Sequence, residues 1–251
     1  MGHLEELEQL MNKIYKPEFV SERIDAIDVR EIVGLEYVFK IHTPTMTETF
    51  CEPAIRRASW IGCTVSVIQQ MTGINAIIFY STFIFTDDED VYMSGNVATV
   101  IVMGVNMVTA IIAFPLLNYF GRRTLMIFTL GLASIFLALE GMFNSKGDGT
   151  MSLSMCLLFI AVFEFGPGPI AWIYMSEVMN EKGVAMGTFL NWLFTLIFAI
   201  FTPYFVDNYP SAVFYGFSSC CALSFIFTII FVKETKGLND TQLQLLYRND
   251  R

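Results

Sequence analysis

Long apolar stretches separated by short polar connectors dominate the chain from residue 58 onward. A bilayer core requires about 20 apolar residues per helix, and the run from Ala58 to Thr86 holds no charge at all. The pattern predicts an all-α membrane protein with six transmembrane helices in one compact bundle. The expected spans are roughly 58–86, 95–119, 124–143, 150–177, 183–206 and 211–232, joined by TDDEDVYMS, FGRR, NSKGDGT, NEKG and DNYP.

The segment before the first span has a different, amphipathic pattern. Residues 1–15 and 21–39 place apolar side chains at helical spacing among charged ones, which predicts two short helices, and residues 43–48 read as a linker. The first 30 residues lack the apolar core of a signal peptide, so we expect the first span to drive insertion. We therefore expect an amphipathic helical segment at 1–55, the membrane domain at 56–234 and a tail at 235–251.

The charged residues predict the orientation of the bundle. Basic residues gather at one end, and the opposite end has only Lys146 among several acidic residues. Because cytosolic loops collect Lys and Arg, we expect the basic end and both termini to be cytosolic. The residues at the basic end are Arg56, Arg57, Arg122, Arg123, Lys182, Lys233 and Lys236.

Composition narrows the function classes. The chain is 54% hydrophobic and only 16% charged, as in membrane proteins, and its net charge of −9 argues against a nucleic-acid partner. The five cysteines fit neither a disulfide framework nor a metal site, so we expect buried thiols and no metal or cofactor. His3 and His42 lie outside the spans, and no HExxH, GxSxG or P-loop pattern occurs. We therefore expect that the protein is not an enzyme.

Polar side chains within the spans are the candidates for function. Intramembrane polar groups face the bundle interior or a wet cavity, and a lone amide usually bonds a neighbouring helix. Here they recur in four spans, which favours one shared polar cavity. They are Gln69, Gln70, Thr72 and Asn75 in the first span, Asn106 in the second, Glu164 in the fourth and Asn191 beside Trp192 in the fifth.

Two spans are expected to be broken near their middle. Thr72-Gly73 interrupts the first, and the stretch Gly166, Pro167, Gly168, Pro169 interrupts the fourth by removing amide donors. Irregular backbone at membrane depth survives where it lines a cavity, and such breaks mark transporter sites. Amides with the face of Trp172 suit a neutral polyhydroxylated solute. For Glu164 two roles stay open, accepting a hydrogen bond from a hydroxyl or binding a proton.

Five motifs in order carry a resemblance to a known family. QQMTGINAIIFYST, FGRRTL, EFGPGPIAW, GTFLNW and KETKGL resemble the motifs of helices seven to twelve of sugar porters, the glucose-transporter branch of the major facilitator superfamily. The resemblance covers residues 56–238 and implies half of a twelve-helix carrier that moves a hexose or similar polyol by alternating access. It implies sugar contacts at Gln69, Gln70, Asn75, Asn106, Glu164, Trp172, Asn191 and Trp192.

The resemblance also implies gating and latch residues. Phe79 and Tyr80 match the family's outer-gate tyrosine pair, with Phe79 lacking one hydroxyl, and the stretch from Gly166 to Pro169 matches its flexible tenth helix. Ala171 replaces a Pro before Trp172, and Lys233 replaces the Pro of PETKG. Asn118-Tyr119 replaces an acid–Arg pair, and an Arg expected after Glu177 is missing. A reduced cytosolic salt-bridge network is implied for Arg122, Arg123, Glu177 and Glu234.

The resemblance reaches only half of such a carrier. A truncated sequence, association with a separate N-terminal half or with a second copy, and a repurposed protein are three alternatives. Three functions follow: sugar transport, which we favour; a sugar sensor or interaction protein without flux; and transport of another solute. Facilitated diffusion is preferred over proton symport because an amide-rich site needs no ion. The plasma membrane is the preferred location.

Overall fold

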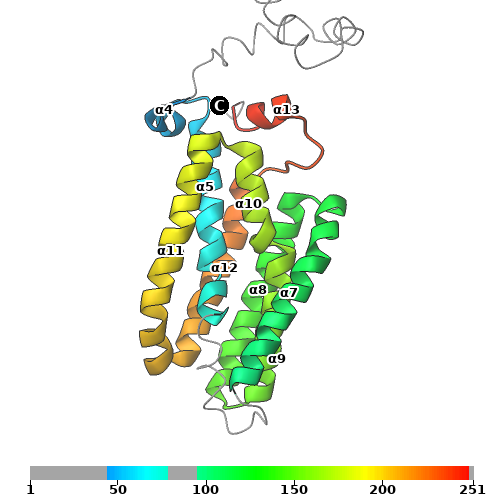
Figure 1. Ribbon diagram of the computed structural model, residues 1–251, viewed down its shortest axis with the longest axis vertical. Helices are drawn as coiled ribbons and strands as arrows, with labels where there is room; N and C mark the ends of the chain where they lie inside the picture. The colour runs from blue at the N-terminus through cyan, green and yellow to red at the C-terminus, as the bar shows by residue number, and fades with distance from the viewer. Residues whose placement is uncertain (1–43, 79–94, 249–251) are drawn as a thin grey trace, which may run out of the picture. The chain divides into compact units, whose positions relative to one another are not determined.

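The computed structural model describes residues 44–78 and 95–248, and within them it is all-helical (Figure 1). The predicted amphipathic helices of residues 1–39 and the gating residues Phe79 and Tyr80 lie outside the described residues. The helices run in the order α4 (Met46–Cys51), α5 (Arg56–Met71), α7 (Gly95–Tyr119), α8 (Arg122–Ser145), α9 (Gly149–Phe165), α10 (Pro167–Val178), α11 (Glu181–Asn208), α12 (Pro210–Phe231) and α13 (Asp240–Leu245).

Six spans of these helices are long and apolar enough to cross a membrane, as the sequence predicted. They are Arg56–Ile78, Thr99–Tyr119, Arg122–Ser145, Gly149–Val178, Glu181–Val206 and Pro210–Phe231. The predicted linker at residues 43–48 was wrong in part, because α4 begins at Met46. Thr45 and Glu48 form a capping box there, each side chain bonding the other's backbone N–H, which nucleates a short helix.

Helix starts follow from capping side chains and proline. The Asp148 carboxylate accepts from Met151 N at 3.0 Å and begins α9, and the Asn180 amide accepts from Gly183 N at 2.8 Å and begins α11. Pro167 and Pro210 stand in the first turns of α10 and α12, where a missing N–H costs nothing.

The helices pack so that α8 lies against α9 and α12, while α5 lies against α10 and α11 (Figure 1). Their buried side chains form two apolar clusters. One includes Ile68 of α5, Met126 of α8 and Tyr174 of α10. The other includes Ile77, just after α5, and Phe159 of α9. In α5 the first cluster ends at Ile68, and in the segment after α5 the second begins at Ile74, so a layer that contains Gln69 and Gln70 separates them.

Both predicted helix breaks occur at this level. α5 ends at Met71 and the chain turns at Gly73, whose φ of +85 favours glycine. α9 ends at Phe165, and Gly166 joins it to α10. A Cβ on Gly166 would lie 1.8 Å from Thr129 Oγ1, so only glycine lets α8 approach this turn. The two breaks therefore place the starts of new helical segments in the middle of the bundle.

Candidate functional site

Four of the predicted amides meet in one hydrogen-bonded group at the break in α5. Gln70 Nε2 donates to Asn191 Oδ1 at 2.8 Å, and Asn191 Nδ2 donates to Gln69 Oε1 at 2.6 Å. Asn75 Nδ2 donates to Gln70 Oε1 at 2.5 Å. With Ser66 and Thr195, described below, these residues form what we call the polar cluster. The group joins α5 and α11 at membrane depth.

The polar cluster also reaches the broken start of α10. Gln69 Nε2 donates to the carbonyl of Gly168 at 2.6 Å. The side chains of Gln69, Gln70 and Asn191 are buried, whereas Asn75 is half-buried. Its Nδ2 has two acceptors, but its Oδ1 receives no hydrogen bond from the described residues. Asn75 is therefore the amide of the cluster with spare capacity for a ligand.

Two residues of the cluster were missed by the sequence reasoning. The Ser66 hydroxyl donates to Gly187 O at 2.6 Å, and the Ser66 carbonyl accepts from Asn191. Thr195 Oγ1 lies 3.4 Å from Asn75 Nδ2. A hydroxyl in a helix is usually satisfied by its own backbone, so neither residue stood out. Thr195 is four residues from Asn191, which places both on one face of α11.

Asn106 and Glu164 form a separate pair on the other side of the α9–α10 break. Asn106 Nδ2 of α7 donates to Glu164 Oε1 of α9 at 2.7 Å, and both side chains are half-buried. Glu164 Oε2 lies beside Gly168, whose carbonyl Gln69 holds from the opposite side. The first turn of α10 thus has an amide on one flank and a carboxyl on the other.

The two tryptophans that were predicted as site residues, Trp172 and Trp192, border this region and are exposed. Trp172 follows Gly168 by one turn of α10 and is 39% exposed. Trp192 follows Asn191 and is 63% exposed. Each therefore offers a ring face that the described helices leave uncovered, and neither contributes to the buried core.

Of the four residues predicted as a salt-bridge network, Arg122, Glu177 and Glu234 are joined by hydrogen bonds at the basic end. Arg122 pairs with Glu177 at 3.0 Å, and the backbone N–H of Arg122 donates to Glu234 Oε1 at 2.8 Å. Arg123 instead donates to the carbonyl of Ile229. One oxygen of Glu177 and Nε of Arg123 have no partner among the described residues, which is consistent with a reduced network.

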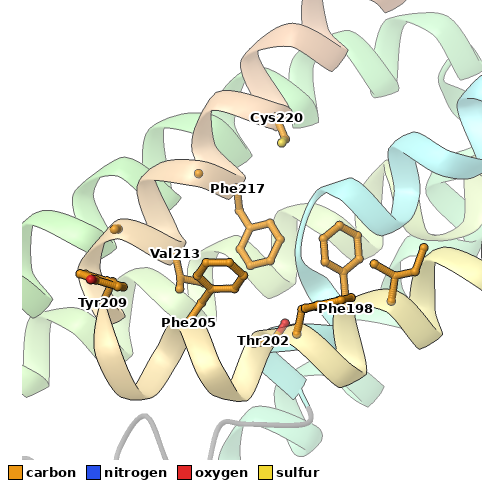
Figure 2. A pocket seen from close by; sticks show the side chains of 11 residues that line it. Phe198, Thr202, Phe205, Tyr209, Val213, Phe217 and Cys220 are labelled. Carbon is orange, nitrogen blue, oxygen red and sulfur yellow. The ribbon is translucent and has the colours of Figure 1, made fainter.

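An apolar groove of about 600 Å³ lies between α11 and α12 (Figure 2). No amide lines it, so it offers little to a hydroxyl-rich solute. Its wall is mainly aromatic and aliphatic: Ile197, Phe198, Phe201, Thr202, Phe205, Tyr209, Ala212, Val213, Gly216, Phe217 and Cys220.

A buried carboxyl, Glu140 of α8, was also missed. It is fully buried, and Ser152 Oγ donates to its Oε1 at 2.6 Å. The signal in the sequence is plain, because Glu140 is the sole charged residue between Arg123 and Lys146. It lies outside the polar cluster. Within residues 44–78 and 95–248, no group of three His, Cys, Asp or Glu could hold a metal ion.

Comparison with known proteins places this architecture beside membrane carriers. The profile described as "Sugar (and other) transporter" matches residues 11–247. The chain is 26% identical to Hexose transporter 1 of Plasmodium vivax, over 94% of this chain and 48% of that protein. It is 33% identical to solute carrier family 2, facilitated glucose transporter member 3, of Oryctolagus cuniculus, over 77% of this chain and 40% of that protein.

The fold is similar to that of a solved carrier. The structure of the proton:xylose symporter XylE bound to 6-bromo-6-deoxy-D-glucose superposes with a TM-score of 0.72 at 22% identity. The match covers 96% of this chain and 51% of that one. The chain thus spans about half the length of the relatives that it matches, and the six spans correspond to half of that twelve-helix fold.

Proposed function

Since the chain belongs to the sugar (and other) transporter family, we propose that it forms half of a twelve-helix carrier that moves a hexose or a similar neutral polyol. It is a multi-pass membrane protein of a transporter family and not an enzyme. The relatives are named for hexose and glucose, which supports this solute class. In the proposal, residues 1–55 and 235–251 flank the membrane domain of residues 56–234, and both termini are cytosolic.

The observation that carries the proposal is the convergence of uncharged amides on the two helix breaks. Gln69, Gln70, Asn75 and Asn191 lie in one group with no fixed charge. Amides and hydroxyls both donate and accept hydrogen bonds. A sugar hydroxyl can therefore take the place of one amide in an amide–amide hydrogen bond, and the remaining amide keeps a hydrogen-bond partner. The Oδ1 of Asn75, which receives no hydrogen bond from the described residues, is the first acceptor available to a sugar hydroxyl.

The remaining site residues border this group. Asn106 and Glu164 supply a second donor–acceptor pair beside Gly168. Trp172 and Trp192 supply open ring faces for the apolar side of a pyranose. Because no cation accompanies the amides, nothing in the polar cluster selects for an anion. An amide-rich site needs no ion to bind its solute, which favours facilitated diffusion over proton symport.

Alternating access then needs two gates. α10 begins at the break, so the stretch from Gly166 to Pro169 can change the angle between α9 and α10. At the basic end the Arg122–Glu177 pair, with Glu234, holds α8, α10 and the start of the tail together. In the proposal this contact closes the cytosolic side, and Phe79 and Tyr80 close the other. The plasma membrane is the preferred location.

The test uses the chain coexpressed with the six-helix N-terminal half of a sugar porter in vesicles. Radiolabelled hexose uptake is measured for wild type, Gln69→Ala, Asn75→Ala and the control Asn208→Ala. The Asn208 amide is exposed, and among the described residues it bonds the Tyr204 carbonyl of its own helix. Losing one ligand bond costs about 1 kcal/mol or more, so we expect at least a fivefold rise in the half-saturating concentration for both cluster variants.

Each other outcome has a separate meaning. Unchanged affinity in both cluster variants contradicts the site. Sugar binding without uptake supports a sensor or interaction protein, and uptake of a labelled solute that hexoses do not compete supports another substrate of the same family. If a second copy of this chain, without the N-terminal half, restores uptake, the partner is the chain itself.

A further inference from the structure

Glu140 is an ionisable residue that is completely buried inside the helix bundle. It lies in α8, its relative exposure is 0%, and its neighbour in the membrane domain is Ser152 of α9. The Ser152 hydroxyl donates to Oε1 at 2.6 Å, and Oε2 has no hydrogen-bond partner among the described residues. One carboxyl oxygen is thus satisfied by a neutral hydroxyl, and the other faces only packed side chains.

Among the described residues, the groups packed around this carboxyl offer no counter-charge. Cys156, one turn after Ser152 on α9, is buried in the apolar cluster that also holds Leu137 of α8. On α12 the nearby titratable groups are Tyr215, whose ring touches Gly141, and Cys221 in the same apolar cluster. Other titratable groups of the packed elements are Cys220 of α12, Lys146 and Asp148 at the α8–α9 turn, and Glu164 near the other end of α9. The far end of α8 carries Arg122 and Arg123, α7 ends at Tyr119, and α10 carries Tyr174 and Glu177, the last paired with Arg122.

An ionised carboxylate accepts hydrogen bonds through both oxygens and requires a cation or several donors when it is buried. One serine hydroxyl does not meet that requirement in a membrane interior. A protonated carboxyl has no charge and so does not need a cation. Its Oε1 keeps the hydrogen bond from Ser152, and its Oε2 becomes an O–H group. The packed geometry therefore suits the neutral acid.

We propose that Glu140 is a proton-binding site that is loaded while α8 and α9 are packed and unloads when this end of the pair opens to water. On unloading, the O–H bond at Oε2 breaks, the proton passes to water or hydroxide, and the carboxylate keeps the electron pair. Glu140 is five residues, about 7.5 Å along the axis, from the end of α8 at Ser145. A modest opening at the α8–α9 turn would bring water to it.

Binding of the proton to Glu140 and packing of α8 on α9 then favour each other. The packed state binds the proton and the opened state releases it, so rising pH favours opening of α8 from α9. This inference does not depend on sugar transport, and it holds for the chain alone or within an assembled carrier. Its ligand is a proton, and the carboxyl of Glu140 is the group that holds it.

Infrared spectroscopy tests the protonation state directly. The full chain in lipid vesicles at neutral pH is compared as wild type, Glu164→Gln, Glu140→Gln and the double variant, in H₂O and D₂O. We expect a carboxylic-acid C=O band in the Glu164→Gln chain that disappears in the double variant. Glu177→Gln is the control, because Glu177 is paired with Arg122, and we expect it to leave the band unchanged. Absence of the band in the Glu164→Gln chain, or a band that survives in the double variant, would overturn the proposal.

Two further measurements test the proposal by other means: one keeps Glu140 and changes its hydrogen-bond donor, and the other measures how thermal unfolding depends on pH. Ser152→Ala removes the donor to Oε1, so the C=O band should persist at a higher frequency; an unmoved band contradicts the assignment. Thermal unfolding of wild type should shift to lower temperature as pH rises, and the shift should be smaller in Glu140→Gln, which stays neutral. Equal shifts in the two chains would contradict the linkage.

Discussion

At the scale of single residues, Asn191 is the centre of the polar cluster. It accepts from Gln70 and donates to both Gln69 and the carbonyl of Ser66. Truncation in Asn191→Ala leaves two buried amide groups without partners, each costing about 1–3 kcal/mol. We expect destabilisation of about 2 kcal/mol or more, measured by thermal unfolding in lipid. Asn208→Ala, whose amide is exposed, should differ from wild type by less than about 0.5 kcal/mol.

Gly73 makes a second prediction at this scale. Its φ of +85 strains any other residue, and an added Cβ would lie 2.4 Å from the Phe217 ring. Gly73→Ala should therefore destabilise the chain by about 2–5 kcal/mol. Gly104 of α7 has nothing within 4 Å of an added Cβ, so Gly104→Ala should be neutral or stabilising by up to about 1 kcal/mol. Equal effects in the two variants would contradict the strained turn.

Residue identity predicted the amides of the site but not all of their partners. A Gln or Asn in an apolar run is expensive enough to be noticed. Ser66 escaped attention because serine is common in helices and its acceptor, Gly187, is 121 residues away. Glu140 shows the opposite limit: its charge was visible, but its complete burial and its single donor come from the packing of α8 on α9.

At the scale of elements, breaks and ends were predictable where glycine, proline or charge marks them. Both interruptions and all six described spans follow such local signals. The docking of the C-terminal tail could not be predicted from local signals, because it depends on side chains that are distant in the sequence. Tyr247, just after α13, reaches Tyr174 of α10, and the two hydroxyls are hydrogen-bonded in the basic-end core.

Lys233 joins this contact through its backbone, which leads to a third prediction. Its N–H donates to the hydroxyls of Tyr247 at 3.0 Å and Tyr174 at 3.2 Å. Lys233→Pro removes that donor, and the extended Val232 accommodates a following proline. A loss of about 1–3 kcal/mol should speed amide exchange in α13 by roughly 5- to 150-fold, as measured by hydrogen–deuterium exchange mass spectrometry.

Lys233→Ala separates the backbone from the side chain. It keeps the N–H but loses the bond from Nζ to Leu246 O at 2.9 Å and the contact with the Tyr247 ring. We expect a smaller increase in α13 exchange than in Lys233→Pro. Identical exchange in the two variants would show that the backbone donor does not hold the tail.

At the scale of the whole molecule, the membrane spans differ in how much of their surface the bundle covers. In α8 and α12 the exposed side chains include Phe128, Leu223 and Ile230, which suit lipid. The spans in α7 and α11 are only 17% buried, against 72% for the span that begins with α5. Near their open faces lie half-buried Asn106 and exposed Trp192. Polar groups facing lipid are costly, so these two faces are the ones that need a protein partner.

Site-specific photo-crosslinking can test this division. A photoreactive residue at Met107 of α7 or Leu196 of α11, which are 61% and 56% exposed, should give a protein adduct when the chain is coexpressed with a six-helix N-terminal half. The same residue at Leu223 of α12, which is 67% exposed, should give only lipid adducts. An adduct of doubled chain mass would identify a second copy as the partner. The three positions are similarly exposed. If Leu223 gives as much protein adduct as the other two, crosslinking depends only on exposure. The proposal that α7 and α11 face a protein partner while α12 faces lipid would then be wrong.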